Sequence, residues 1–173
     1  SAWAELREAQ TYALSLPNTG MAVTTDIGDA KDIHPKNKQD VGKRLATLAL
    51  ANTYRKMKVG SGPLYRSMKV SGTGIVLSFT GTGTGLKAKG NGNLLGFEVA
   101  GADKVFYAAT AIIKGHKVTV SSPEVKNPVA VRYGWADDAG SINLFNKEGF
   151  PASPFRTDRW KGITADARFS FSN

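Results

Sequence analysis

A change of pattern at residues 58–63 (Lys-Val-Gly-Ser-Gly-Pro) limits what this chain can fold into more than any other feature. Before it, apolar residues recur at helical spacing. After it, short runs of β-forming residues alternate with turns. The sequence therefore predicts two parts, residues 1–58 and 59–160, which are followed by a tail at 161–173.

The first part is predicted to contain a helix, a strand, a loop and a second helix. Residues 2–15 have a helical spacing of apolar side chains, and Ser1 is placed to cap them. Residues 21–25 are rich in β-branched side chains and predict a buried strand, and a polar loop follows at 26–35. Residues 38–56 predict the second helix. One strand cannot bury two helices, so this part is expected to be the closing unit of a layered α/β domain. The apolar face of the second helix would be formed by Val41, Leu45, Leu48, Ala49 and Tyr54.

The second part has the pattern of an antiparallel β-sandwich, which makes the whole chain α+β. Six runs with turn signals between them predict the strands: 64–70, 75–80, 96–100, 105–113, 117–121 and 129–135. Residues 142–160 predict an irregular, aromatic-rich segment. The tail alternates from Arg168 onward and is expected to be either an added edge strand or a disordered end.

Charge and composition exclude several classes of site. The net charge is +9, and residues 31–70 carry ten Lys/Arg against two acids, so this segment alone carries +8. Few aromatic residues are interleaved with this basic stripe and no nucleic-acid motif lies on it, which favours a solvated helix face or a surface that meets an acidic partner domain over nucleic-acid binding. The absence of cysteine excludes disulfides, thiolate metal sites and a Cys nucleophile.

Other classes of function lack a sequence signal. No apolar run reaches the roughly 18 residues of a membrane span, so no membrane partner is predicted. No metal or other cofactor is predicted. The glycine-rich run at 81–85 lacks a following GK[ST] and a following helix, so it predicts a sandwich loop and not a phosphate-binding loop.

Two histidines are the candidates for acid–base chemistry. His116 lies at a predicted hairpin turn and is expected to be a surface residue. His34 lies in the polar loop after the predicted strand, at the edge where catalytic loops of open α/β sheets gather, and Asp32 precedes it by two residues. A carboxylate that orients an imidazole is half of a Ser-His-Asp system. Spacing alone leaves a capping or surface role open.

Longer motifs resemble the sialate O-acetylesterase family, a branch of the SGNH hydrolases. Residues 26–38 (DIGDAKDIHPKNK) are similar to the catalytic-histidine block of that family, and the similarity extends over nearly all of residues 2–160. The further matching motifs are WAELREAQ at 3–10, LPNTGMAV at 16–23, GPLY at 62–65, GFEVAGAD at 96–103, NPVAVRYGW at 127–135 and GFPASPFRTD at 149–158.

The resemblance implies a serine esterase that removes acetyl groups from sugars such as sialic acid or a plant polysaccharide. His34 would be the general base, and Asp32 would orient the ring. Many SGNH hydrolases place the acid three residues before the histidine, where this chain has Lys31, so Asp29 is retained as the alternative acid. The expected fold is the terminal helix–strand–helix of an SGNH domain, followed by the sandwich. The resemblance favours a periplasmic or secreted full-length protein.

The family's Gly-Asp-Ser nucleophile block does not occur in these 173 residues. We therefore expect the serine and the oxyanion donors to be supplied by an N-terminal hydrolase portion, and this chain alone to be inactive. Residues 1–58 should then expose apolar surface, including parts of 21–23 and the face of Leu45 and Leu48, through which the chain could self-associate. The alternative is a non-catalytic sandwich module that supports folding or holds carbohydrate. Trp135 and the segments 143–146 and 151–152 could contact sugar, although an interdomain plug, with Trp135 in the sandwich core, is favoured.

Overall fold

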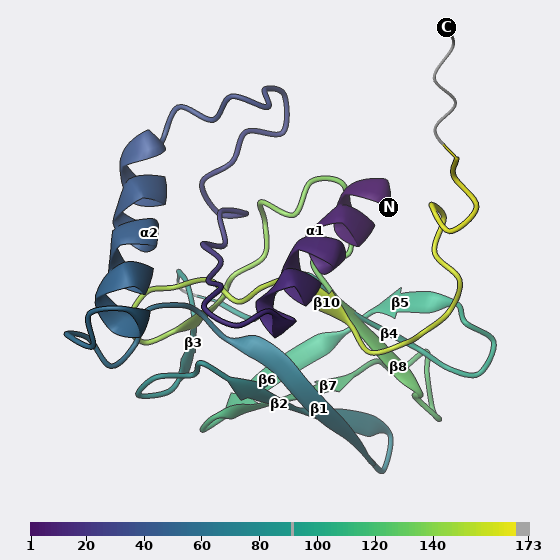
Figure 1. Cartoon of the computed structure of the whole chain (residues 1–173). Coiled ribbons are helices and arrows are strands. Elements are labelled where there is room, and N and C mark those ends of the chain that lie inside the picture. Colours follow the sequence, from purple (N-terminus) through teal and green to yellow (C-terminus); the bar gives the residue numbers. More distant parts are fainter. Residues whose placement is uncertain (91, 169–173) are drawn as a thin grey trace, which may run out of the picture.

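Two helices lie on one side of the β-strands in the computed structural model, which describes residues 1–90 and 92–168 (Figure 1). Helix α1 (Ala2–Tyr12) continues into a short 3₁₀ turn, η1 (Ala13–Ser15), and helix α2 is Lys38–Asn52. Side-chain caps fix both starts as expected for such residues. Ser1 Oγ accepts from the amide of Ala4, and Asn37 Oδ1 accepts from the amide of Asp40.

The predicted strand at 21–25 is wrong. The segment between the helices forms no strand, since no strand of the described residues pairs with it. One of its carbonyls, that of Val23, is instead satisfied by the Arg44 guanidinium of α2. Helix α2 also ends four residues earlier than predicted. The predicted apolar face of α2 is only partly covered: Leu48 is half-buried, whereas Leu45 is exposed, as the sequence predicts. The buried residue of this helix is Thr47.

The remaining strands form a sandwich of two four-stranded antiparallel sheets and a separate two-stranded sheet. The first sheet has the order β1-β2-β7-β6, the second β10-β8-β4-β5, and the third pairs β3 with β9. The strands are β1 (Leu64–Ser71), β2 (Gly74–Thr80), β3 (Leu86–Ala88), β4 (Phe97–Ala100), β5 (Phe106–Ala108), β6 (Thr110–Lys114), β7 (Lys117–Ser121), β8 (Ala130–Tyr133), β9 (Leu144–Asn146) and β10 (Phe155–Arg156).

The core lies between the two larger sheets and is made by alternate residues of their central strands. Leu77 and Val118 come from the first sheet, Val99 and Val131 from the second, and all four are fully buried. Alternation on each strand points the intervening residues away from this core. The β-sandwich predicted for this part of the chain is thus present.

Two predicted β runs and the segment predicted to be irregular differ from the observed strands. The run 105–113 is two strands, because the chain leaves the second sheet at Ala109 and enters the first as β6. The run 129–135 shortens to β8, since Gly134 has a φ of +60°. Residues 142–160 contain β9 and β10, and β3 was not predicted. The tail has no strand over 161–168, and the predicted alternating run at 168–172 lies mostly outside the described residues.

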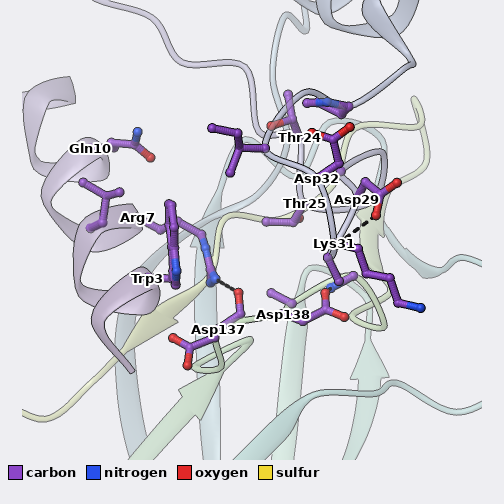
Figure 2. A pocket seen from close by; sticks show the side chains of 17 residues that line it. Trp3, Arg7, Gln10, Thr24, Thr25, Asp29, Lys31, Asp32, Asp137 and Asp138 are labelled. Carbon is purple, nitrogen blue, oxygen red and sulfur yellow. Dashed lines mark hydrogen bonds between the residues drawn. The ribbon is translucent and has the colours of Figure 1, made fainter.

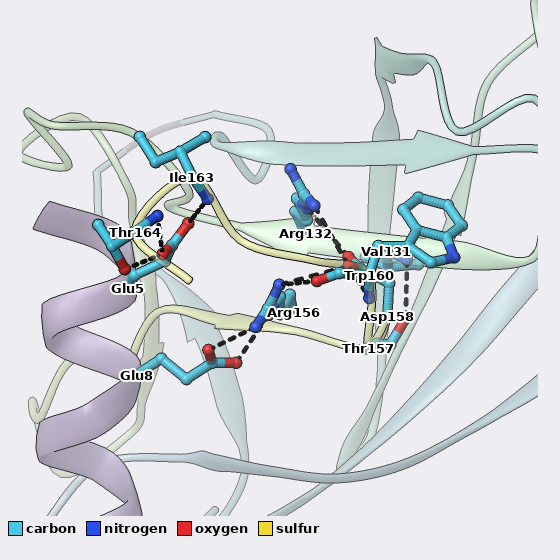
Figure 3. Close-up of polar contacts among 10 residues, drawn as sticks. All are labelled: Glu5, Glu8, Val131, Arg132, Arg156, Thr157, Asp158, Trp160, Ile163 and Thr164. Atoms are coloured by element: carbon cyan, nitrogen blue, oxygen red, sulfur yellow. Dashed lines mark hydrogen bonds and ion pairs between the residues drawn. The ribbon is translucent and has the colours of Figure 1, made fainter. Parts of the chain in front are cut away.

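Helix α1 is fixed to the second sheet by partly buried charged groups (Figure 3). Glu8 accepts two hydrogen bonds from Arg156 of β10, both at 2.9 Å. Asp158, whose side chain is 1% exposed, pairs with Arg132 of β8 at 3.0 Å and with Arg156 at 3.7 Å. The bond to Glu8 raises the pKa of Arg156, and burial opposes this rise. The helix is therefore held to the sandwich by a charged seam in which each partly buried cation has an anionic partner.

Candidate functional site

The loop at 26–35 brings Asp32 and His34 into contact. His34 Nδ1 lies 3.1 Å from Asp32 Oδ1, and the same oxygen accepts the backbone N–H of His34 at 2.8 Å. The imidazole is largely exposed, at 79% of its side-chain surface. A carboxylate at Nδ1 leaves Nε2 free to exchange a proton with another group.

Asp29, the alternative acid, has a different role in the loop. Its Oδ1 accepts the backbone N–H of Lys31 at 2.9 Å, and its backbone forms a short bridge with Asp32. Asp29 thus folds the turn that precedes the histidine. Of the two predicted acids, Asp32 is the one that the structure places against the imidazole.

A cavity of about 550 Å³ lies beside this loop (Figure 2). One wall is α1, which contributes Trp3 and Gln10. The opposite wall is the loop, with Asp29 and Asp32, and the sandwich closes the floor with residues 137–140. The indole of Trp3 is half exposed. An aromatic face together with carboxylates and an amide is a combination that suits a polar ligand with an apolar face.

Arg7 fixes the cavity floor. Its guanidinium donates to the carbonyls of Gly134, Ala136 and Asp137 at 2.7–3.4 Å. Burial holds the pKa of Arg7 below its ordinary value, and the nearby carboxylates of Asp137 and Asp138 offset part of this effect. Because its donors are directed at backbone carbonyls, Arg7 holds the 134–138 segment in place beside α1.

A buried carboxylate, Asp26, anchors the start of the loop. Arg44 of α2 binds it in a bidentate pair at 2.7 and 2.9 Å, and Lys89 of the sandwich approaches at 3.3 Å. Burial by itself would raise the pKa of Asp26. The hydrogen bonds and charges of Arg44 and Lys89 outweigh it, so the pKa lies below its ordinary value. The sequence contained no periodic signal for this cluster, because its three members come from separate elements.

The amides and the indole considered as a sugar-contacting patch are occupied by the protein itself. Asn146 is fully buried and donates to the carbonyls of Ser61 and Gly81, so its amide is used within the sandwich part of the chain. Asn143 donates to Lys89 and Asn93. Trp135 is half-buried outside the sandwich core, with the guanidiniums of Arg132 and Arg156 over its ring at 5.4 and 5.0 Å.

The other sequence candidates occupy surface positions. His116 lies in the β6–β7 turn, where its Nδ1 is 2.8 Å from Thr82 Oγ1. In the basic stripe, Arg44 is the one cation of the ten that is not exposed. Within residues 1–90 and 92–168, no three His, Cys, Asp or Glu side chains gather to hold a metal, and no helix has the length and apolarity of a membrane span.

Comparison with known proteins gives a likeness among solved structures. No family model matches the chain, and no curated protein does. Among solved structures, the chain is similar to the crystal structure of a novel carbohydrate acetylesterase from Xanthomonas citri, with 48% identity and a TM-score of 0.89. The match covers 92% of this chain and 37% of the other. The chain therefore resembles one part of that protein in sequence and fold, and it spans just over a third of that protein's length.

Proposed function

We propose that this chain is the part of a carbohydrate O-acetylesterase that supplies the catalytic histidine. The observation that carries the proposal is the joint one of 48% identity to such an enzyme over most of the chain and an Asp32–His34 pair with a free Nε2. The finer assignment, to an SGNH hydrolase of the sialate O-acetylesterase branch, rests on the motif around His34. The partner portion would bring the serine and the oxyanion donors.

In this mechanism His34 takes the proton from the serine hydroxyl as its oxygen bonds to the acetyl carbon. The imidazolium then gives that proton to the sugar oxygen as the ester C–O bond breaks, and the acetyl group stays on the serine. A water molecule attacks the acetyl carbon in the second half, with His34 again accepting the proton, and acetate leaves as the serine recovers its hydrogen. Asp32 stabilises the imidazolium in both halves.

The cavity beside the loop would hold the sugar. Trp3 offers an exposed aromatic face, and the carboxylates of Asp29 and Asp32 lie on the opposite wall. Sugars present both an apolar ring face and hydroxyl donors, so both kinds of wall would be used. This part of the proposal concerns acetylated carbohydrate as a class, with acetylated sialic acid and acetylated xylan as the two substrates to compare.

The test is a chimera in which this chain replaces the matching part of the Xanthomonas citri enzyme. The chimera is expected to release acetate from an acetylated sugar, whereas the chain alone gives none above buffer. His34→Ala should lower kcat/KM by about 10³-fold or more, and His116→Ala serves as the matched control. Asp32→Asn should be far more damaging than Asp29→Asn. Full activity of His34→Ala, or hydrolysis by the chain alone, would contradict the proposal.

A further inference from the structure

The loop that carries Asp32 and His34 is attached to the protein mainly at its two ends. Within the described chain, every hydrogen bond made by residues 28–35 stays inside the loop. At the far end, Asn37 caps α2. At the near end is Asp26. The direction in which the loop presents His34 therefore depends on what holds these two residues.

Asp26 is held to the same helix that the far end begins. Arg44 lies six residues into α2 and binds both carboxylate oxygens of Asp26, and its Nη1 also donates to the carbonyl of Val23 at 2.5 Å. The side chains of Asp26 and Arg44 are 4% and 11% exposed. A bidentate, charge-assisted pair that is shielded from water defines an orientation as well as a distance. The loop is thereby closed at its base on one helix.

A third contact ties the base of the loop to the sandwich. Lys89 follows β3, and its ammonium lies 3.3 Å from Asp26 Oδ2 and 5.1 Å from the Phe145 ring centroid. Its backbone is fixed by Asn143 on both sides: the Lys89 N–H donates to the Asn143 carbonyl at 2.8 Å, and the Asn143 side-chain amide donates back at 3.3 Å. One carboxylate thus joins the loop, α2 and the sandwich.

We infer that Asp26 is a positioning residue, which orients the His34 loop by binding Arg44 and Lys89 at once. The catalytic consequence rests on the proposed esterase function, while the ordering of the loop does not. An imidazole displaced by about 1 Å from its productive position can lose on the order of 10²-fold in rate. Removing one partner of a buried pair leaves the other charge unpaired, so Asp26 and Arg44 should each be indispensable to the arrangement.

The first arm of the test measures loop order in this chain, by ¹⁵N relaxation of residues 28–35. Asp26→Asn and Arg44→Lys are expected to lower the backbone order parameters of these residues from near 0.85 to below about 0.6. Lys89→Met, which keeps a stem near Phe145, should give a smaller drop and remains informative if the other variants unfold. Asp166→Asn is the control, because it breaks the exposed Lys161–Asp166 pair. Unchanged loop order parameters in folded variants, with sandwich chemical shifts as in the parent chain, would overturn the inference.

The second arm uses the acetylesterase chimera described above. Asp26→Asn should lower kcat by roughly 10–100-fold with little change in KM, and Asp26→Glu should recover part of the loss. Equal kcat in the Asp26→Asn and unsubstituted chimeras would reject positioning of the histidine. A chimera that is inactive before any substitution would contradict the esterase proposal alone, because the relaxation measurements on the 173-residue chain would still decide the ordering of the loop.

Discussion

Gly62 lies where the chain passes from α2 to the sandwich, and it has no room for a side chain. A Cβ built there would lie 1.9 Å from the carbonyl oxygen of Pro151. Asn146 donates to the neighbouring carbonyl of Ser61 and so closes the same junction. We expect Gly62→Ala to destabilise the chain by about 1–3 kcal/mol, because the backbone at Pro151 has to move. Chemical denaturation measures this change.

Gly42 provides the matched control for this substitution. It lies on the exposed side of α2, and a Cβ there would meet nothing within 4 Å. Alanine is favoured over glycine inside a helix, so Gly42→Ala should stabilise the chain by about 0.5–1 kcal/mol. Opposite signs for the two substitutions would assign the Gly62 effect to crowding at the junction. Equal stability of Gly62→Ala and the parent chain would show that the junction is loose.

Residue patterns were sufficient for some features of the candidate site and insufficient for others. The contact between Asp32 and His34 follows from their two-residue spacing, since a turn brings such side chains together. The partners of Asp26 could not be predicted in the same way. Arg44 and Lys89 lie 18 and 63 residues away, and their approach depends on how α2 and the sandwich pack.

At the scale of elements, the charged seam between α1 and the second sheet should contribute to the stability of the fold. Its contribution can be measured by substituting its two partners singly and together. Glu8 and Arg156 are 15% and 14% exposed, and Arg156 also donates to the carbonyl of Trp160. We expect Glu8→Gln and Arg156→Gln each to lower the free energy of unfolding by about 2–4 kcal/mol, because each leaves a charge with fewer partners. The double variant should lose less than the sum, with a coupling energy of about 0.5–3 kcal/mol.

The measurement is a double-mutant cycle by urea denaturation. Additive losses would mean that α1 is held by its apolar contacts and that the Glu8–Arg156 pair contributes little. The exposed pair Lys161–Asp166 supplies the comparison, and its removal should change stability by less than about 1 kcal/mol.

Helices and strands with a clear periodicity of apolar residues could be predicted from the sequence. Elements that depend on pairing with a distant strand could not. Both helices and most sandwich strands begin within a few residues of their predicted starts, since capping residues and alternation are local signals. The segment at 21–25 has the composition of a strand but does not form one, because a strand needs a neighbour that these residues do not meet. The three-residue strands β3 and β9 are too short to show a period.

The whole molecule carries its exposed apolar side chains unevenly. Of the sixteen large hydrophobic side chains that are exposed among the described residues, nine belong to residues 1–58, including Trp3, Leu16 and Leu45. An excess of exposed apolar side chains in one part of a chain is typical of an interaction surface. The proposed occupant is the hydrolase portion that would supply the serine, and the length of the Xanthomonas citri enzyme beyond the matched part is sufficient for one.

Without that portion, we expect this surface to make the chain associate with itself. Sedimentation equilibrium at about 100 µM protein should show dimers or larger species, and the double variant Leu16→Glu/Leu45→Glu should be monomeric because each substitution places a charge in the apolar contact.

The matched variant is Ile112→Glu, which adds one charge to the exposed face of β6, an edge strand of the first sheet. It should leave the association intact. A monomeric parent chain would contradict the prediction. Loss of association in Ile112→Glu alone would instead assign the contact to pairing of β6 edges, since an unpaired strand edge is the other surface of this fold that can join two copies.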